Sequence, residues 1–169
     1  MIILGIDPGT ATTGYGVIVT KNHKHQKQDR NEKPKVVDFG CITTTALFSP
    51  GERLKIIHEE IHKLIKKHKP DVISIENLFF FKNLKTAMPV SQAKGVILLA
   101  AANNNIPIME FTPLQVKMTV VGYGKAEKKQ VQEMTKQLLD LTGFDVNEKH
   151  RKKDDASDAL GVALCAFLC

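Results

Sequence analysis

The chain has 169 residues, of which 43% are hydrophobic, and its formal net charge at pH 7 is +6. This length and composition predict a single domain over residues 1–169 with one sizeable core. The positive charge favours a polyanionic partner, nucleic acid or an anionic membrane surface. Three cysteines without a C-x-x-C spacing argue against a disulfide framework or a zinc site. No apolar run reaches the roughly 20 residues that span a bilayer, so we expect a soluble, cytoplasmic protein.

Three strands are predicted at the start of the chain. They cover residues 2–6, 14–19 and 36–45. The first strand is almost purely apolar, and the turn residues Pro8-Gly9-Thr10 follow it, which predicts a hairpin between the first two strands. Short connections of this kind favour an antiparallel meander.

A basic stretch, residues 21–35, separates the second and third predicted strands. It carries six Lys or Arg side chains against Asp29 and Glu32 and has no apolar periodicity. This composition predicts an exposed, flexible basic loop. We interpret it as a solvated, tolerated insertion, with added phosphate contacts as the alternative.

Helices and strands alternate over the rest of the chain. The expected elements are helix 51–69, strand 71–76, helix 86–104, strand 106–111, a helix that Thr112 and Pro113 begin, helix 125–141 and helix 154–168. A β-α-β-α-β order favours parallel strands with right-handed crossovers. Together with the meander, it predicts an α/β fold with a mixed five-stranded sheet and helices on both faces.

Two acidic residues stand at the ends of apolar strands. Asp7 follows residues 2–6, and Glu76 follows residues 72–75 in the same way. Because ligands bind at the carboxyl edge of parallel strands, we expect these two acids to face a common site. Local structure offers an equally good explanation for each, since Asp7 suits the start of a turn and Glu76 suits the cap of one.

Asp155 and Asp158 lie three residues apart in the last predicted helix. At about 100° per residue they are within roughly 60° of each other on one helix face. Ala156 and Ala159 beside them allow that helix to pack on the sheet. The alternative is a cap with favourable helix-dipole charges, and it fits Asp154 better than either of the other two acids.

Four carboxylates in one poorly solvated site raise one another's pKa at a cost in free energy. A divalent cation offsets that cost, and ligands that are all oxygen favour Mg²⁺ or Mn²⁺. Two such ions about 4 Å apart suit in-line cleavage of a phosphodiester. Asp7, Glu76, Asp155 and Asp158 are therefore predicted to be both the catalytic residues and the metal ligands of a nuclease.

The sequence around these residues strongly resembles the RuvC family of bacterial crossover junction (Holliday junction) endonucleases. The matching segments span nearly the whole chain in the family order. They are Gly5 to Thr10, Gly14 to Gly16, Ile75-Glu76, Phe79 with Lys82-Asn83, Gln92 to Gly95, Gln115 to Lys117, Val120 to Gly122, Ala126 to Lys128, Gln130-Val131 and Asp155 to Leu160. The resemblance implies a ribonuclease-H-like fold, a homodimer, magnesium-dependent paired nicks in a four-way DNA junction, and association with the RuvA–RuvB branch-migration complex.

The resemblance also implies DNA-binding roles outside the acidic set. Lys117 and Lys128 match family positions near the scissile phosphate, which implies phosphate binding and charge stabilisation. Phe79 matches the family's single key aromatic by its distance from Glu76, and we expect it to stack on or wedge between bases at the junction centre. Two further phenylalanines follow it, which departs from the family pattern. Without the resemblance, the lysines are ordinary surface residues and Phe79 is a core candidate.

Two weaker predictions concern surfaces. The apolar helix 86–104 is a candidate dimer interface, with ordinary core packing as the alternative for at least half of its surface. Basic residues on either side of the predicted site are candidates for an electrostatic rim. They are Lys82, Lys85, Arg151, Lys152 and Lys153.

Three other functions compete with this interpretation. The turn at Asp7 to Thr10 with Gly14 also suits the phosphate loop of actin-like ATPases, which need a second, duplicated half that 169 residues cannot supply. A non-catalytic junction-binding module is disfavoured because all four carboxylate positions are filled. The third is a nuclease of the same fold that acts on RNA–DNA hybrids or other branched DNA.

Overall fold

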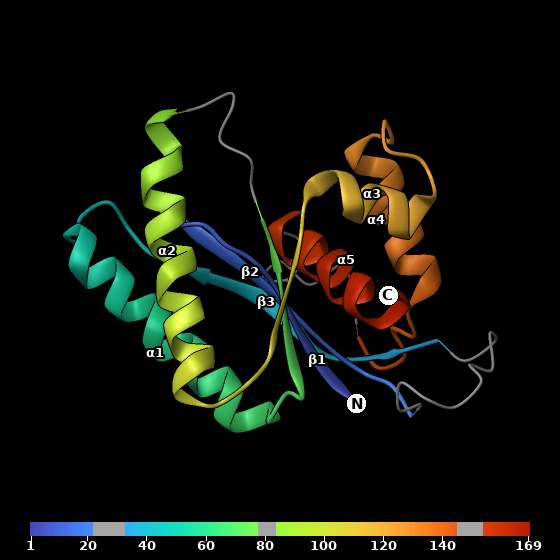
Figure 1. Ribbon diagram of the computed structural model, residues 1–169, viewed down its shortest axis with the longest axis horizontal. Helices are drawn as coiled ribbons and strands as arrows, with labels where there is room; N and C mark the ends of the chain where they lie inside the picture. The colour runs from blue at the N-terminus through green and yellow to red at the C-terminus, as the bar shows by residue number, and fades with distance from the viewer. Residues whose placement is uncertain (22–32, 78–83, 145–153) are drawn as a thin grey trace.

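The computed structural model describes residues 1–21, 33–77, 84–144 and 154–169 and contains one five-stranded sheet (Figure 1). The strands are β1 (Ile2–Asp7), β2 (Thr12–Val19), β3 (Lys35–Thr43), β4 (Val72–Glu76) and β5 (Ile108–Phe111). Their order is β3-β2-β1-β4-β5; β1, β2 and β3 pair antiparallel, whereas β4 pairs parallel to both β1 and β5. The predicted mixed sheet is therefore confirmed.

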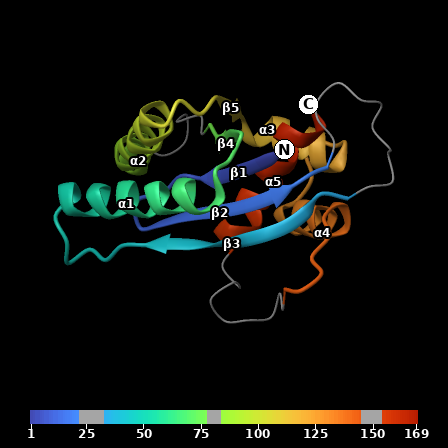
Figure 2. The same ribbon diagram turned by 90° about the horizontal axis from the view of Figure 1, so that it is seen from below.

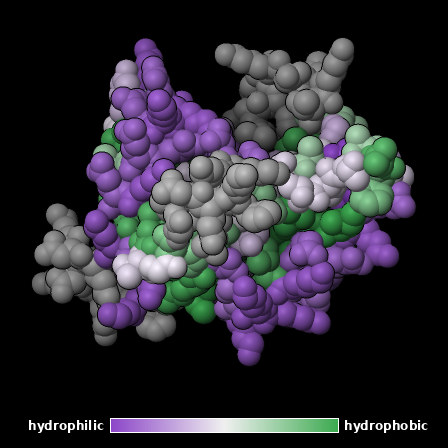
Figure 3. All heavy atoms as spheres, turned by 180° about the vertical axis from the view of Figure 1, so that it is seen from behind, coloured by the Kyte–Doolittle hydropathy of each residue, from purple (hydrophilic) through white to green (hydrophobic). Residues whose placement is uncertain are grey.

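Within the described residues, five helices cover the two faces of this sheet. They are α1 (Pro50–His68), α2 (Leu84–Asn103), α3 (Pro113–Val121), α4 (Lys128–Leu138) and α5 (Asp154–Leu168). Figures 1 and 2 show α1 and α2 on one side of the sheet and α3, α4 and α5 on the other. From behind, the outward surfaces of α1 and α4 are largely hydrophilic (Figure 3), as expected for helices that bury one face only.

Successive strand residues supply the two cores alternately. Ile3 and Ile18 pack with α5, whereas Leu4 and Val17 pack with α1 and α2. Side chains of a strand point to opposite faces with period two, so a sheet buried on both faces needs an apolar residue at every position. This requirement explains the unbroken apolar run of β1.

Local signals in the sequence set several helix ends. Ser49 and Thr112 each form a capping box at the start of α1 and α3. The predicted stop before Pro70 is confirmed, since α1 ends at His68 and Lys69 follows with a left-handed φ of 48°. Among the described residues, no helix is both long and apolar enough to cross a membrane.

The predicted helix 125–141 was too long at both ends. The helix begins after Glu127 and ends at Leu138, and the backbone beyond it is extended. There Asp140 pairs with the edge strand: the Asp140 amide donates to the Pro34 carbonyl, and the Val36 amide donates to the Asp140 carbonyl, both at 2.9 Å. The open edge of β3 thus competes for backbone hydrogen bonds that would continue the helix.

Smaller differences concern other boundaries. Helix α2 begins at Leu84, two residues before its predicted start. Strand β5 begins at Ile108, two residues after its own predicted start and directly after Pro107. Strand β3 begins at Lys35, the last residue of the stretch predicted as a loop. Residues 22–32 of that stretch lie outside the described residues.

Candidate active site

Four acidic side chains come together at one end of the sheet. Asp7 and Glu76 end the neighbouring parallel strands β1 and β4, whose register pairs Ile6 with Ile75. Asp155 and Asp158 occupy the first two turns of α5. One carboxylate oxygen from each of Asp7, Asp155 and Asp158 lies within 4.8 Å of the other two. Glu76 shares a hydrogen bond with Asp7, so the structure brings all four predicted acids together.

Helix α5 delivers its two acids because glycines let it lie directly on the sheet. A Cβ atom on Gly14 would overlap the backbone carbonyl of Asp155, and one on Gly5 would overlap the carbonyl of Ala159. The buried Ser74 hydroxyl fixes the same helix by donating to the Val162 carbonyl at 2.7 Å. The backbone of β1, β2 and β4 therefore determines where Asp155 stands.

Burial and mutual repulsion make this acidic cluster energetically unfavourable without a cation. Burial is the largest cause that raises the pKa of Asp7, and the nearby Glu76, Asp158 and Asp155 carboxylates add to it, so that the pKa reaches about 8. Burial and the charge of Asp158 also raise the pKa of Glu76, although its hydrogen bond with Asp7 and the charge of Lys128 act in the opposite direction. Without a cation, Asp7 is therefore the carboxyl that holds a proton near neutral pH.

Lys128 contacts the cluster from α4. Its Nζ lies 2.8 Å from Asp158 Oδ2 and 3.5 Å from Asp154 Oδ2. Partial burial lowers the pKa of Lys128, but the contacts with Asp158 and Asp154 outweigh burial and the pKa is raised overall. The predicted phosphate-binding lysine thus stays charged and lies at the rim of the acidic site.

The donor set fits a divalent cation. Three carboxylate oxygens lie close enough to share one ion, and no sulfur or nitrogen ligand belongs to this group of described residues. Hard oxygen donors of this kind suit ions such as Mg²⁺, Mn²⁺ or Ca²⁺. The raised pKa of Asp7 is what crowded carboxylates show when no cation compensates them. Exposed Asp154, whose carboxylate is drawn toward Lys128, stays outside the group, as predicted.

Other predicted residues are less fully placed. Lys117 is half-buried on α3 and takes part in none of the ion pairs found within the described part of the chain. Phe79, Phe80 and Phe81 lie outside the described residues. The same holds for four of the five rim candidates: Lys82, Arg151, Lys152 and Lys153. The fifth, Lys85, lies in the first turn of α2.

Two polar residues near the acids were missed by sequence reasoning. Gln132 on α4 donates from Nε2 to Asp158 Oδ1 at 3.5 Å, and it follows Lys128 by one helical turn. Lys94 on α2 contacts Glu110 at 2.6 Å and the Asn77 side-chain oxygen at 3.2 Å, beside a cavity of about 210 Å³ that Glu76 also lines. The sequence did contain a signal for Lys94, because a lysine within an otherwise apolar helix indicates a polar contact.

Comparisons with known proteins identify the family. The family model described as "Crossover junction endodeoxyribonuclease RuvC" matches residues 3–166. A relative of that name from Ruminiclostridium cellulolyticum is 50% identical, over 98% of this chain and 90% of its own length. One from Alkaliphilus oremlandii is 49% identical, over 98% of this chain and 92% of its own length.

Solved structures agree with this result. T. thermophilus RuvC in complex with a Holliday junction substrate superimposes with a TM-score of 0.84 and 27% identity, covering 99% of this chain and 93% of the other. The expected ribonuclease-H-like fold is therefore confirmed. The chain belongs to the RuvC family of crossover junction endodeoxyribonucleases.

Proposed function

We propose that this protein cleaves Holliday junctions, four-way DNA intermediates of recombination and repair, by paired nicks in strands of like polarity. Asp7, Asp155 and Asp158 come together at one edge of the sheet, and Glu76 is hydrogen-bonded to Asp7. This arrangement is the main support for the proposal. The T. thermophilus relative with a Holliday junction substrate supports the choice of DNA.

We assign Asp7, Glu76, Asp155 and Asp158 to catalysis and to holding two Mg²⁺ ions, for which Mn²⁺ can substitute. Bound ions of this kind activate water for attack and neutralise charge on the leaving oxygen. The chain's own contribution is to fix the ligands before substrate arrives. Two carboxylates stand on neighbouring strands and two on a helix pressed against those strands, so their spacing is set by the core.

We assign Lys128 and Lys117 to the scissile region of the DNA backbone. The Lys128 ammonium lies 2.8 Å from Asp158. A positive charge beside the acids would attract a phosphate oxygen, which supports this assignment. The role of Lys117 is inferred from its match to a family position, which lies on α3.

Phe79 follows Glu76 by three residues. We propose that it stacks on bases at the junction centre, where unstacking costs less free energy than in an intact duplex.

We further propose a homodimer of single-domain subunits, with α2 as the interface. A four-way junction offers two equivalent strands, and a twofold dimer presents two equivalent sites to them. Met88 and Leu99 on α2 are 69% and 54% exposed, although Ala93 and Ile97 of the same helix are fully buried in the core. One face of the helix therefore packs in the core, and Met88 and Leu99 lie on a face that is available to a partner. The family implies the RuvA–RuvB complex as a further partner and a cytoplasmic location.

A comparison of substrates tests the proposed function. Wild-type protein would be incubated with a four-way junction, an RNA–DNA hybrid and a plain duplex of the same sequence, each with Mg²⁺, with Mn²⁺ and with EDTA. We expect paired, symmetric nicks in the junction with either metal, little cleavage of the other substrates, and none in EDTA.

The possible outcomes separate the competing functions. Preferential cleavage of the hybrid would instead identify a nuclease of the same fold with another substrate. Tight junction binding without nicks under any divalent metal would identify a binding module. Nicks in EDTA would contradict the metal-dependent site.

A further inference from the structure

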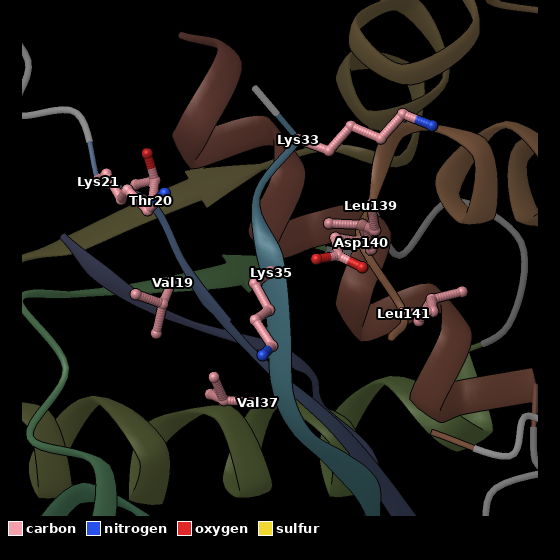
Figure 4. A pocket seen from close by; sticks show the side chains of 9 residues that line it. All are labelled: Val19, Thr20, Lys21, Lys33, Lys35, Val37, Leu139, Asp140 and Leu141. Carbon is pink, nitrogen blue, oxygen red and sulfur yellow. The ribbon is translucent and has the colours of Figure 1, made fainter. Parts of the chain in front are cut away.

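A second charged site lies at the opposite end of the sheet from the acids. A groove of about 630 Å³ opens where β2 ends, β3 begins and the chain leaves α4 (Figure 4). Asp7 stands at the last residue of β1, whereas the N-terminal amine, one residue before β1, donates to the Thr20 carbonyl of this groove at 2.6 Å. Since β1 has six residues at about 3.3 Å each, the groove and the acids are separated by roughly 20 Å.

Three lysines and an apolar floor line the groove. Lys21 follows the end of β2, Lys33 lies two residues before β3, and Lys35 is the first residue of β3 (Figure 4). The remaining lining residues are Val19, Val37, Leu139, Leu141, Thr20 and Asp140. Three lysines and one carboxylate give the nine lining residues a net positive charge.

The single acid of the groove is already engaged. The Asp140 carboxylate accepts hydrogen bonds from the amide of Thr142 at 2.9 Å and from its hydroxyl. These bonds, with the charges of Lys35 and Lys33, lower the pKa of Asp140. Neither of these two lysines forms an ion pair with another described residue at direct-contact distance. Asp140 therefore neutralises little of the positive charge.

The groove brings together both ends of the basic stretch. Lys21 and Lys33 are twelve positions apart in the sequence, but the antiparallel register of β2 and β3 places Val19 opposite Lys35. The pairing of β2 with β3 therefore brings Lys21, Lys33 and Lys35, which stand at the two described ends of the stretch, to one surface.

We propose that the groove is a second DNA-binding site that holds backbone phosphates of a junction arm, about six base pairs from the cleaved step. The inference rests on the proposed function. B-DNA rises 3.4 Å per base pair, so 20 Å corresponds to that separation, and an arm of ordinary length reaches both sites. Lysine ammoniums bind phosphate as point charges, and the valine and leucine floor can contact deoxyribose and the lysine stems.

The chemistry of the lining favours backbone contact over sequence reading. None of the nine lining residues is an arginine, asparagine, glutamine or aromatic residue, whose planar groups make paired hydrogen bonds with base edges or stack on bases. Lysine ammoniums bind phosphate oxygens as point charges. The groove is therefore expected to add affinity and orientation without base preference.

The salt dependence of junction binding tests this site. Lys21, Lys33 and Lys35 would be changed to Gln together, and the matched control would change Lys55, Lys63 and Lys66 of α1, which are exposed as well, to Gln. Binding of a junction would be measured in Ca²⁺, without cleavage, over a fourfold range of salt. Each phosphate contact contributes about 0.9 to the slope of log K against log salt. We expect the groove variant to lose about 2 to 3 from this slope, and the control to lose little.

Three results would overturn the proposal. Equal losses in both triple variants would show an effect of net charge alone. Unchanged binding in the groove variant would exclude DNA, and an acidic protein partner would then be the better occupant. Absence of junction-dependent protection of the three lysines against acetylation, followed by mass spectrometry, would also exclude DNA. Wild-type cleavage in Mg²⁺ is scored separately, so failure of the groove is distinguishable from failure of the resolvase function.

Discussion

The two ends of the central sheet carry opposite charges and are built differently. At the carboxyl ends of β1 and β4, acids are crowded together, half-buried and held by regular elements that pack in the core. At the other end, lysines line an open groove between strand ends and the segment after α4. Burial and the neighbouring carboxylates raise the pKa of Asp7 to about 8, whereas the lysines of the groove are exposed.

Holding carboxylates together and binding a polyanion place different demands on the structure. Bringing like charges together costs free energy, so a rigid scaffold must hold them, and here that scaffold is a helix lying on glycine residues of two strands. Binding a long polyanion requires only that positive charges face it, because the interaction is strong over several ångströms. The acidic end is therefore expected to tolerate changes poorly, and the basic end to tolerate them one residue at a time.

The largest effect is expected for the acid with the most perturbed pKa. Asp7→Asn removes a carboxylate from the metal-ligand set, and we expect junction cleavage in Mg²⁺ to fall by about 1000-fold or more. Junction binding in Ca²⁺ should stay within about threefold, because the basic groove is unchanged. Asp154→Asn is the matched control and should retain cleavage. Full activity of Asp7→Asn would remove Asp7 from the site.

The scaffold itself can be tested at a position without charge. Gly14→Ala places a Cβ against the Asp155 carbonyl, so α5 must shift away from β2. A displacement of about 1 Å at a reacting group can cost about 100-fold in rate, and we expect a loss of that size in junction cleavage. Gly51→Ala is the control, since a Cβ there meets nothing within 4 Å.

Two readouts make this scaffold test specific. Circular dichroism and thermal unfolding would show whether Gly14→Ala still folds, with an expected loss of about 1–3 kcal/mol from overpacking. A variant that folds and cleaves normally would show that close contact between α5 and β2 is not what positions Asp155.

Much of the acidic end could be predicted from the sequence, because it depends on periodicity that each element carries by itself. Apolar runs located the strands that Asp7 and Glu76 end, and three-residue spacing placed Asp155 and Asp158 on one helix face. That α5 packs directly on Gly14 could not be predicted, since it depends on which elements meet in space.

The basic end depended more on tertiary structure. The composition of residues 21–35 shows that the stretch is basic, but the position of Lys33 and Lys35 beside Asp140 results from strand register and from edge pairing after α4. That pairing also explains the overlong prediction of the helix, because helical spacing continues in the sequence beyond Leu138. Local pattern contains no information on a competing strand edge.

The crowding of the acidic end should also be visible in stability. The folded-state pKa of Asp7 is raised to about 8 from its ordinary 3.8, so the folded, metal-free protein holds a proton that the unfolded chain releases. Stability should therefore fall as pH rises from about 4 to 8. Asp7→Asn should remove this loss and stabilise the metal-free protein at pH 7.5 by about 2 kcal/mol, or several degrees in Tm.

Thermal unfolding in EDTA over this pH range is the measurement. Asp154→Asn, at an exposed acid beside the cluster, should change stability by no more than about 0.5 kcal/mol. Adding Mg²⁺ should stabilise the wild-type protein and not Asp7→Asn, since binding to the folded state alone raises Tm. A wild-type protein whose metal-free stability is flat between pH 4 and 8 would contradict the crowded-carboxylate account.

Asp38 on β3 provides a contrast with Asp7, because its pKa is lowered and not raised. Burial raises the pKa of Asp38 on β3, but hydrogen bonds from Lys67 at 2.7 Å and His68 at 2.9 Å, together with their charges, outweigh burial and lower it overall. A lowered folded-state pKa adds stability that is present above the ordinary value of 3.8 and is lost as pH falls below it. We expect Asp38→Asn to cost about 0.5–1 kcal/mol at pH 7, a difference that shrinks below pH 3.8. Urea unfolding at pH 7 and pH 3 measures it, and a cost that persists at pH 3 would assign the effect to packing instead of charge.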